Sequence, residues 1–136
     1  MSIEKSQQTA NQCILIVDDN VELLDLTKMI LEANGYHVVT ALSGKEALTL
    51  LAKIDKLDLI LLDMRMEDMS GPEFIVRLER ELPEIFGSVP VVFISGEENI
   101  PISKASGFIR KPFDMTEFLA TVRRYIEIGT SQIRLN

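Results

Sequence analysis

The sequence has few of the residues that build disulfides and metal clusters. Its 136 residues include one cysteine, Cys13, and one histidine, His37. A single cysteine excludes an internal disulfide and a cysteine-based zinc site, and a single histidine excludes a multi-histidine metal centre. We expect His37 to be structural, because it stands at the start of a predicted strand. The composition thus excludes disulfide-rich secreted scaffolds and zinc modules.

Long hydrophobic runs and excess positive charge are also missing. The longest apolar run, residues 57–64, is interrupted by two aspartates and is too short to span a membrane. The polar N-terminus has no apolar stretch of the kind that a signal peptide needs. With 14 basic and 21 acidic side chains, the net charge is −7, which disfavours binding to nucleic acid or to an anionic membrane. We therefore expect a soluble cytoplasmic protein that contacts neither directly.

Five short apolar runs alternate with amphipathic segments. The runs predict strands at residues 13–17, 37–41, 58–62, 89–94 and 107–110. Three of them are apolar without alternation, which is typical of parallel strands covered on both faces. This pattern predicts an open α/β sandwich with one domain at residues 13–128. Residues 1–12 and 129–136 are polar and are predicted to be terminal tails.

The segments between the predicted strands carry helix signals. Asp19 or Asn20 can cap a first helix, whose predicted apolar face is Leu23, Leu26, Ile30 and Ala33, and Asn34-Gly35 can end it. Three later segments open with a capping residue followed three positions on by glutamate, at Ser43, Ser70 and Asp114. Pro83 is predicted to end the third helix. Only residues 96–106 connect the last two strands, which predicts at most two turns of helix there.

Polar side chains gather where the predicted strands end. Asp18 and Asp19 follow the first strand, Asp63 follows the third, Ser95 ends the fourth and Lys111 follows the fifth. Ligands of open parallel sheets bind at this edge. Two like charges 4 Å apart repel by about 4 kcal/mol at an effective dielectric constant near 20, so the carboxylates favour Mg²⁺, which prefers oxygen ligands. Each residue alone could equally be a turn former, a helix cap or a solvated side chain, and the signal is their combination.

These strand ends resemble the receiver domain of two-component response regulators. The similar motifs are ILIVDD at 14–19, LILLDMRM at 59–66, VVFIS at 91–95 and RKPFD at 110–114. The resemblance implies a flavodoxin-like, doubly wound, five-stranded parallel sheet of order 2-1-3-4-5. It also implies transfer of a phosphoryl group from a histidine kinase or phosphotransfer protein, and a surface that a downstream effector protein reads. Such a chain catalyses only its own phosphorylation and dephosphorylation.

The resemblance also implies a role for each site residue. Asp63 would accept the phosphoryl group, and Asp18, Asp19, Asp63 and the backbone carbonyl of Arg65 would bind Mg²⁺. Lys111 would contact one phosphoryl oxygen.

The remaining implied roles belong to a switch. Ser95 would hydrogen-bond a phosphoryl oxygen, and Phe108 would then turn inward as the switch aromatic. Three features depart from the family pattern: Glu67 stands where proline is usual, Phe108 lacks the polar tip of tyrosine or histidine, and the fourth helix region is short. We expect residues 97–101 to form a loop, so that output uses another surface or this loop is remodelled by phosphorylation.

Two other functions fit parts of the sequence. A pseudo-receiver would have the same fold and bind proteins without being phosphorylated, which the complete set of site residues disfavours. An aspartate-nucleophile phosphohydrolase usually has a second aspartate two residues after the nucleophile, where Arg65 stands here. The sequence also has neither a phosphate-binding P-loop nor a dinucleotide-binding glycine pattern.

Overall fold

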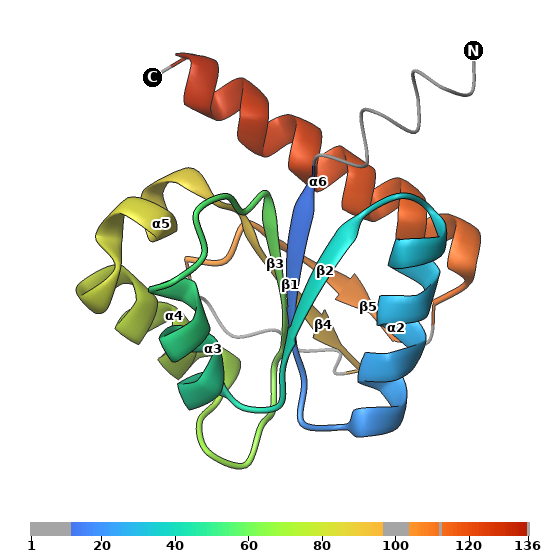
Figure 1. Ribbon diagram of the computed structural model, residues 1–136, viewed down its shortest axis with the longest axis horizontal. Helices are drawn as coiled ribbons and strands as arrows, with labels where there is room; N and C mark the ends of the chain where they lie inside the picture. The colour runs from blue at the N-terminus through green and yellow to red at the C-terminus, as the bar shows by residue number, and fades with distance from the viewer. Residues whose placement is uncertain (1–11, 97–103, 112, 136) are drawn as a thin grey trace.

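The computed structural model describes residues 12–96, 104–111 and 113–135. Its strands are β1 (Cys13–Val17), β2 (His37–Ala41), β3 (Leu59–Asp63), β4 (Val91–Ser95) and β5 (Gly107–Arg110). They form one parallel sheet of order β2-β1-β3-β4-β5 (Figure 1). This order confirms the flavodoxin-like fold, and the point at which the strand order reverses lies between β1 and β3. The loop predicted at 97–101 lies outside the described residues, as does most of the N-terminal tail.

Helices cover both faces of the sheet. The helices α3 (Gly44–Leu51), α4 (Gly71–Glu81) and α5 (Pro83–Ser88) lie on one face, and α2 (Val21–Ala33) and α6 (Met115–Leu135) on the other (Figure 1). Successive strand residues point to opposite faces, so Leu15 and Val17 join one core cluster while Ile14 and Ile16 join the other. Both clusters are anchored in β1, β3 and β4, which are buried from end to end apart from Asp63.

The predicted helix starts are confirmed by their capping hydrogen bonds. Asn20 Oδ1 accepts the N–H of Leu23 at 3.2 Å, so Asn20 rather than Asp19 caps α2. Ser43, Ser70 and Asp114 likewise each accept the N–H of the glutamate three residues on, at 3.0, 3.2 and 2.7 Å. At the end of α2, Gly35 has a φ of 92°, which glycine adopts without strain. Local sequence signals therefore located these helix ends correctly.

The predicted buried face of α2 is wrong except at Ile30. Its buried residues are Leu24, Thr27, Ile30 and Leu31, whereas Leu26 is 48% exposed. The buried face is rotated relative to the prediction, which left out Thr27 because threonine is polar. Its hydroxyl donates to the backbone carbonyl of Leu23 at 2.9 Å, which satisfies the buried group within the helix itself.

Two features of the later helices go beyond the prediction. Pro83 follows α4 as expected, but it opens the additional short helix α5, because proline is tolerated in a first helical turn. The helix α6 continues to Leu135, and the domain bounds 13–128 remain a prediction. Gly129 weakens a helix by only about 1 kcal/mol relative to alanine and does not end this one. Among the described residues, no helix combines the length and apolar character needed to cross a membrane.

Candidate functional site

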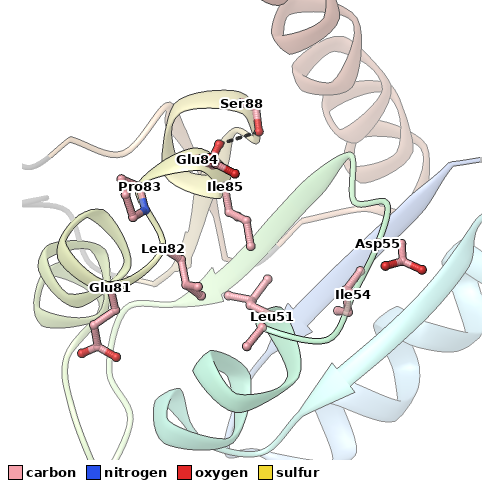
Figure 2. A pocket seen from close by; sticks show the side chains of 10 residues that line it. Leu51, Ile54, Asp55, Glu81, Leu82, Pro83, Glu84, Ile85 and Ser88 are labelled. Atoms are coloured by element: carbon pink, nitrogen blue, oxygen red, sulfur yellow. Dashed lines mark hydrogen bonds between the residues drawn. The ribbon is translucent and has the colours of Figure 1, made fainter.

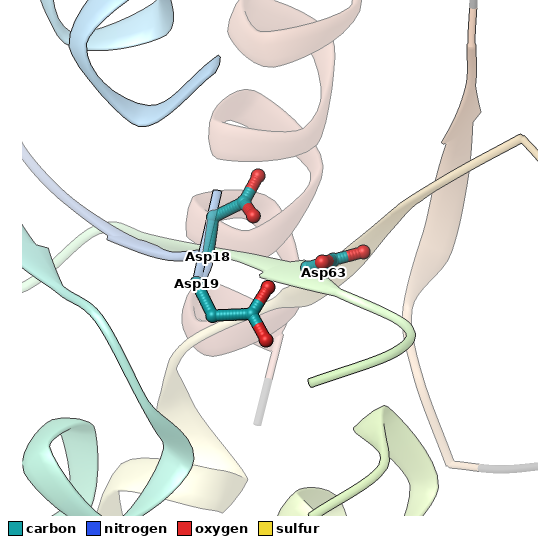
Figure 3. A group of neighbouring side chains, drawn as sticks. All are labelled: Asp18, Asp19 and Asp63. Atoms are coloured by element: carbon teal, nitrogen blue, oxygen red, sulfur yellow. The ribbon is translucent and has the colours of Figure 1, made fainter. Parts of the chain in front are cut away.

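Three carboxylates meet at the carboxyl edge of the sheet, beside the strand-order reversal. Asp18 and Asp19 follow β1, Asp63 ends the neighbouring β3, and one oxygen from each lies within 4.8 Å of the others (Figure 3). Asp18 is buried, the Asp63 side chain is 13% exposed and Asp19 is exposed. The cluster is therefore buried on one side and open to solvent on the other.

Backbone N–H groups hold each carboxylate in place. Asp18 Oδ1 accepts the N–H of Asn20 at 2.9 Å, and Asp63 Oδ1 accepts the N–H of Arg65 at 3.4 Å. Asp19 Oδ2 accepts the N–H of Glu67 at 3.0 Å, across 48 positions of the sequence. The loop after β3 therefore contributes to the orientation of two of the three carboxylates.

The ionised form of Asp63 is unfavourable in this environment. Burial raises the pKa of Asp63 to about 6, and repulsion from the Asp18 carboxylate acts in the same direction. The Lys111 ammonium lies 3.9 Å from Asp63 Oδ1 and offsets part of this effect by lowering the pKa. A cation bound among the carboxylates would lower it further, because it would favour the ionised form.

The cluster has the ligand chemistry of a hard divalent cation. It offers carboxylate oxygens from three residues, Asp18, Asp19 and Asp63, and an open side. Mg²⁺ is usually held by one or two carboxylates and keeps several waters, so it needs such an open side. Arg65, whose side chain is exposed, lies two residues after Asp63, and its backbone is paired with Ser70 in an isolated bridge. The residues present fit Mg²⁺.

The other predicted site residues lie next to this cluster or beyond it. Ser95 is 3% exposed at the end of β4, and its hydroxyl donates to the sulfur of Met64 at 3.8 Å. Lys111 donates its backbone N–H to the carbonyl of Ser95 at 2.8 Å, which joins the ends of β4 and β5. Phe108 is 43% exposed on β5 and is not part of the cluster. The contact of Met64 with Ser95 could not be predicted, because nothing in the apolar sequence around Met64 distinguishes it from a core residue.

A groove of about 550 Å³ lies at the opposite edge of the sheet (Figure 2). It is formed by the end of α3 and the segment that follows, which lead into β3, and by α4 and α5, which lie between β3 and β4 in the chain. Its apolar side chains include Leu51, Leu82 and Ile85, and three acidic residues, Asp55, Glu81 and Glu84, also line it. None of the predicted site residues lines this groove.

Comparisons with known proteins agree with the fold and the site. The response regulator receiver domain model matches residues 14–123. The transcriptional regulatory protein YvrH of Bacillus subtilis is 36% identical over 125 residues, which cover 86% of this chain and 50% of that protein. The polar-differentiation response regulator DivK of Brucella ovis is 31% identical over 119 residues, which cover 83% of this chain and 94% of DivK.

A solved structure of a similar protein has the same fold. The chemotaxis protein CheY4 of Vibrio cholerae has 28% sequence identity and a TM-score of 0.76, over 84% of this chain and 98% of that one. The chain spans only part of some relatives, such as 23% of the transcriptional regulatory protein GlrR of Escherichia coli. The family model covers residues 14–123, and DivK is matched over 94% of its own length, so the chain belongs to the response regulator receiver domain family of two-component systems.

Proposed function

We propose that this receiver domain takes a phosphoryl group from a histidine kinase or phosphotransfer protein onto Asp63, with Mg²⁺ as cofactor. The observation that carries the proposal is the meeting of three carboxylates and the Lys111 ammonium at one edge of the sheet. Among these groups Asp63 has the raised pKa. Such perturbed groups concentrate at functional sites.

The metal ligands in this proposal are Asp18, Asp19, Asp63 and the backbone carbonyl of Arg65. Mg²⁺ bound there would supply positive charge beside the oxygens of the transferred group. Its binding would also relieve the repulsion that raises the pKa of Asp63. Carboxylate repulsion in the metal-free protein thus becomes part of the driving force for cation binding.

The transfer itself needs little from the protein beyond position and charge. A carboxylate oxygen of Asp63 attacks phosphorus in line, an O–P bond forms, and the N–P bond of the donor phosphohistidine breaks and leaves imidazole. Lys111, 3.9 Å from Asp63 in the resting site, faces the negative charge on the phosphoryl oxygens. Catalysis is positioning plus electrostatic stabilisation, and the chain acts only on its own phosphorylation and dephosphorylation.

The switch in this proposal starts at Ser95. Its buried hydroxyl exchanges the sulfur of Met64 for a phosphoryl oxygen, and Phe108, 43% exposed at rest, turns inward. A downstream effector protein reads the changed surface. We propose that this occurs in the cytoplasm. The net charge of −7 supports the further proposal that the domain does not contact nucleic acid or an anionic membrane directly.

Phosphorylation by acetyl phosphate tests the proposal. The protein is incubated with Mg²⁺ and acetyl phosphate, and intact mass should show one added phosphoryl group. The variant Asp63→Asn should gain none, while Asp55→Asn, an exposed aspartate at the groove, should behave as wild type. A wild-type protein that binds Mg²⁺ and gains no phosphoryl group would be a pseudo-receiver. Turnover of unrelated phosphate esters would indicate the phosphohydrolase.

A further inference from the structure

The loop between β3 and α4 is attached to the neighbouring helix α3 by a single carboxylate. Asp68 Oδ1 accepts the N–H of Gly44 at 3.1 Å, and Asp68 Oδ2 accepts the N–H of Lys45 at 2.9 Å. Gly44 and Lys45 are the first two residues of α3. The contact joins segments more than 20 positions apart in the sequence, so it is tertiary structure rather than a local cap.

This attachment completes the start of α3. The first N–H groups of a helix have no partner within the helix. Ser43 satisfies the N–H of Glu46, and Asp68 satisfies the two that precede it. A negative charge at a helix N-terminus is favourable, and hydrogen bonds to an ionised acceptor are the stronger kind. Asp68 therefore holds the loop against a rigid element.

A second contact closes the same junction. Met69, the next residue of the loop, is 8% exposed and packs on Gly44. A Cβ on Gly44 would lie 2.6 Å from the sulfur of Met69, so a larger residue would force the methionine to move. Loop and helix thus meet through one bidentate carboxylate and one close packing contact.

The same loop orients a carboxylate of the proposed metal site. Among the residues that the structure describes, the Asp19 side chain accepts one hydrogen bond, from the N–H of Glu67. Asp19 is exposed, so packing does little to restrain it. Glu67 immediately precedes Asp68, and a shift of the loop would move the Glu67 N–H away from Asp19.

We propose that Asp68 is a positioning residue for the metal site: by fixing the loop to α3, it holds the Glu67 N–H where it orients Asp19. The effect on Mg²⁺ rests on the proposed function, while the link from Asp68 to Glu67 and Asp19 does not. Outer partners that orient metal ligands contribute about tenfold or more to metal affinity. Asp68 acts through a backbone group, without itself touching the metal.

The test compares Asp68→Asn with Glu67→Gln. Both variants lose one negative charge at adjacent positions, but Glu67→Gln keeps the backbone N–H that Asp19 uses. Amide hydrogen exchange is measured by NMR in the Mg²⁺-free protein, and Mg²⁺ affinity by titration of the amide shifts. In Asp68→Asn the amides of Gly44, Lys45 and Glu67 should exchange faster, and Mg²⁺ binding should weaken about tenfold. Glu67→Gln should leave those amides protected and weaken binding at least threefold less.

A second variant changes the α3 side of the same junction and leaves the charge unchanged. Gly44→Ala displaces Met69, and it should weaken Mg²⁺ binding in the same direction as Asp68→Asn. Circular dichroism checks that each variant is folded.

The outcomes separate this inference from the proposed function. Unchanged exchange of the Glu67 amide in Asp68→Asn would overturn the inference, whatever the metal does. Equal weakening of Mg²⁺ binding by Asp68→Asn and Glu67→Gln would also overturn it, because charge alone would then explain the effect. A wild-type protein that binds Mg²⁺ without being phosphorylated by acetyl phosphate would refute the proposed phosphotransfer and leave the positioning role of Asp68 standing.

Discussion

Acidic residues gather at both edges of the sheet, and their surroundings differ. At the carboxyl edge, Asp18 and Asp63 are largely buried, and the pKa of Asp63 is raised to about 6 by burial and by Asp18. At the groove on the amino edge, Glu81 is exposed, and a hydrogen bond from the Arg77 guanidinium lowers its pKa. The same chemical group is unfavourably ionised at one edge and favourably ionised at the other.

The difference shows what an acidic cluster must have to indicate a site. In the groove, the nearest cation to Glu81 is on its own helix, and solvent screens its charge. At the carboxyl edge, two neighbouring strands bring the carboxylates together in a place that water reaches from one side only. Burial and convergence, rather than the number of acidic residues, therefore distinguish the proposed phosphorylation site.

The largest expected effect is on the pH dependence of stability. A folded-state pKa near 6 against an ordinary value of 3.8 means that folded Asp63 binds its proton more tightly than unfolded Asp63. Stability must then fall as the pH rises through this window, by on the order of 3 kcal/mol in total. Without Mg²⁺, Asp63→Asn should be more stable than wild type at pH 8 and similar at pH 4. Urea denaturation followed by circular dichroism, at several pH values with EDTA, measures this.

Glu81→Gln is the control for that experiment. Its folded-state pKa is lowered, so Glu81 contributes stability above its ordinary pKa and loses it as the pH falls. The Gln variant should therefore show no stabilisation at pH 8. If Asp63→Asn were no more stable than wild type at pH 8, the claim that ionised Asp63 destabilises the folded protein would be refuted.

A pair of glycines gives the next comparison. At the carboxyl edge, a Cβ on Gly71 would lie 2.5 Å from the Phe93 ring and 3.1 Å from the Met64 Cα. At the amino edge, a Cβ on Gly87 in α5 would meet nothing within 4 Å. Gly71→Ala should destabilise the protein by about 2 kcal/mol through overpacking. Gly87→Ala should be neutral or stabilise it by up to about 1 kcal/mol, because alanine favours helix. Equal effects in denaturant midpoints would contradict the contrast in packing.

Much of the fold and most of the site could be predicted because the signals are local. The strands are short apolar runs, and Asp18, Asp19, Asp63 and Lys111 stand directly at their ends. Chain order then brings these residues to one edge of a parallel sheet. The helix starts are likewise set by neighbouring residues. The buried face of α2 was the exception. Thr27 is a polar residue, but its hydroxyl is hydrogen-bonded within the helix, so it can be buried where the sequence predicts exposure.

The contacts that hold the site together could not be predicted. Asp19 is oriented by the N–H of Glu67. Every residue except proline has a backbone N–H, so the residue type at position 67 does not reveal this contact. Asp68 accepts hydrogen bonds from α3, which lies more than 20 positions earlier in the sequence. From the sequence alone, an aspartate in a loop indicates a turn just as well as such a distant contact. The sulfur of Met64 beside Ser95 belongs to an ordinary core residue by every sequence criterion. Side-chain identity predicted the acids, and the tertiary structure supplied their partners.

The smallest expected effect concerns the exposed ion pair in the groove wall. Arg77 Nε lies 2.9 Å from Glu81 Oε2, with both side chains about 40% exposed. Arg77→Ala should raise the Glu81 pKa toward its ordinary value, which carboxyl-carbon NMR titration detects, while the urea midpoint at pH 7 barely moves. Lys111→Ala, its counterpart at the other edge, should raise the Asp63 pKa further above 6, because the nearby ammonium now lowers it. If Arg77→Ala changed stability at pH 8 as much as Asp63→Asn does, the groove carboxylates would be as strongly coupled to the fold as those at the carboxyl edge, and the contrast between the two edges would fail.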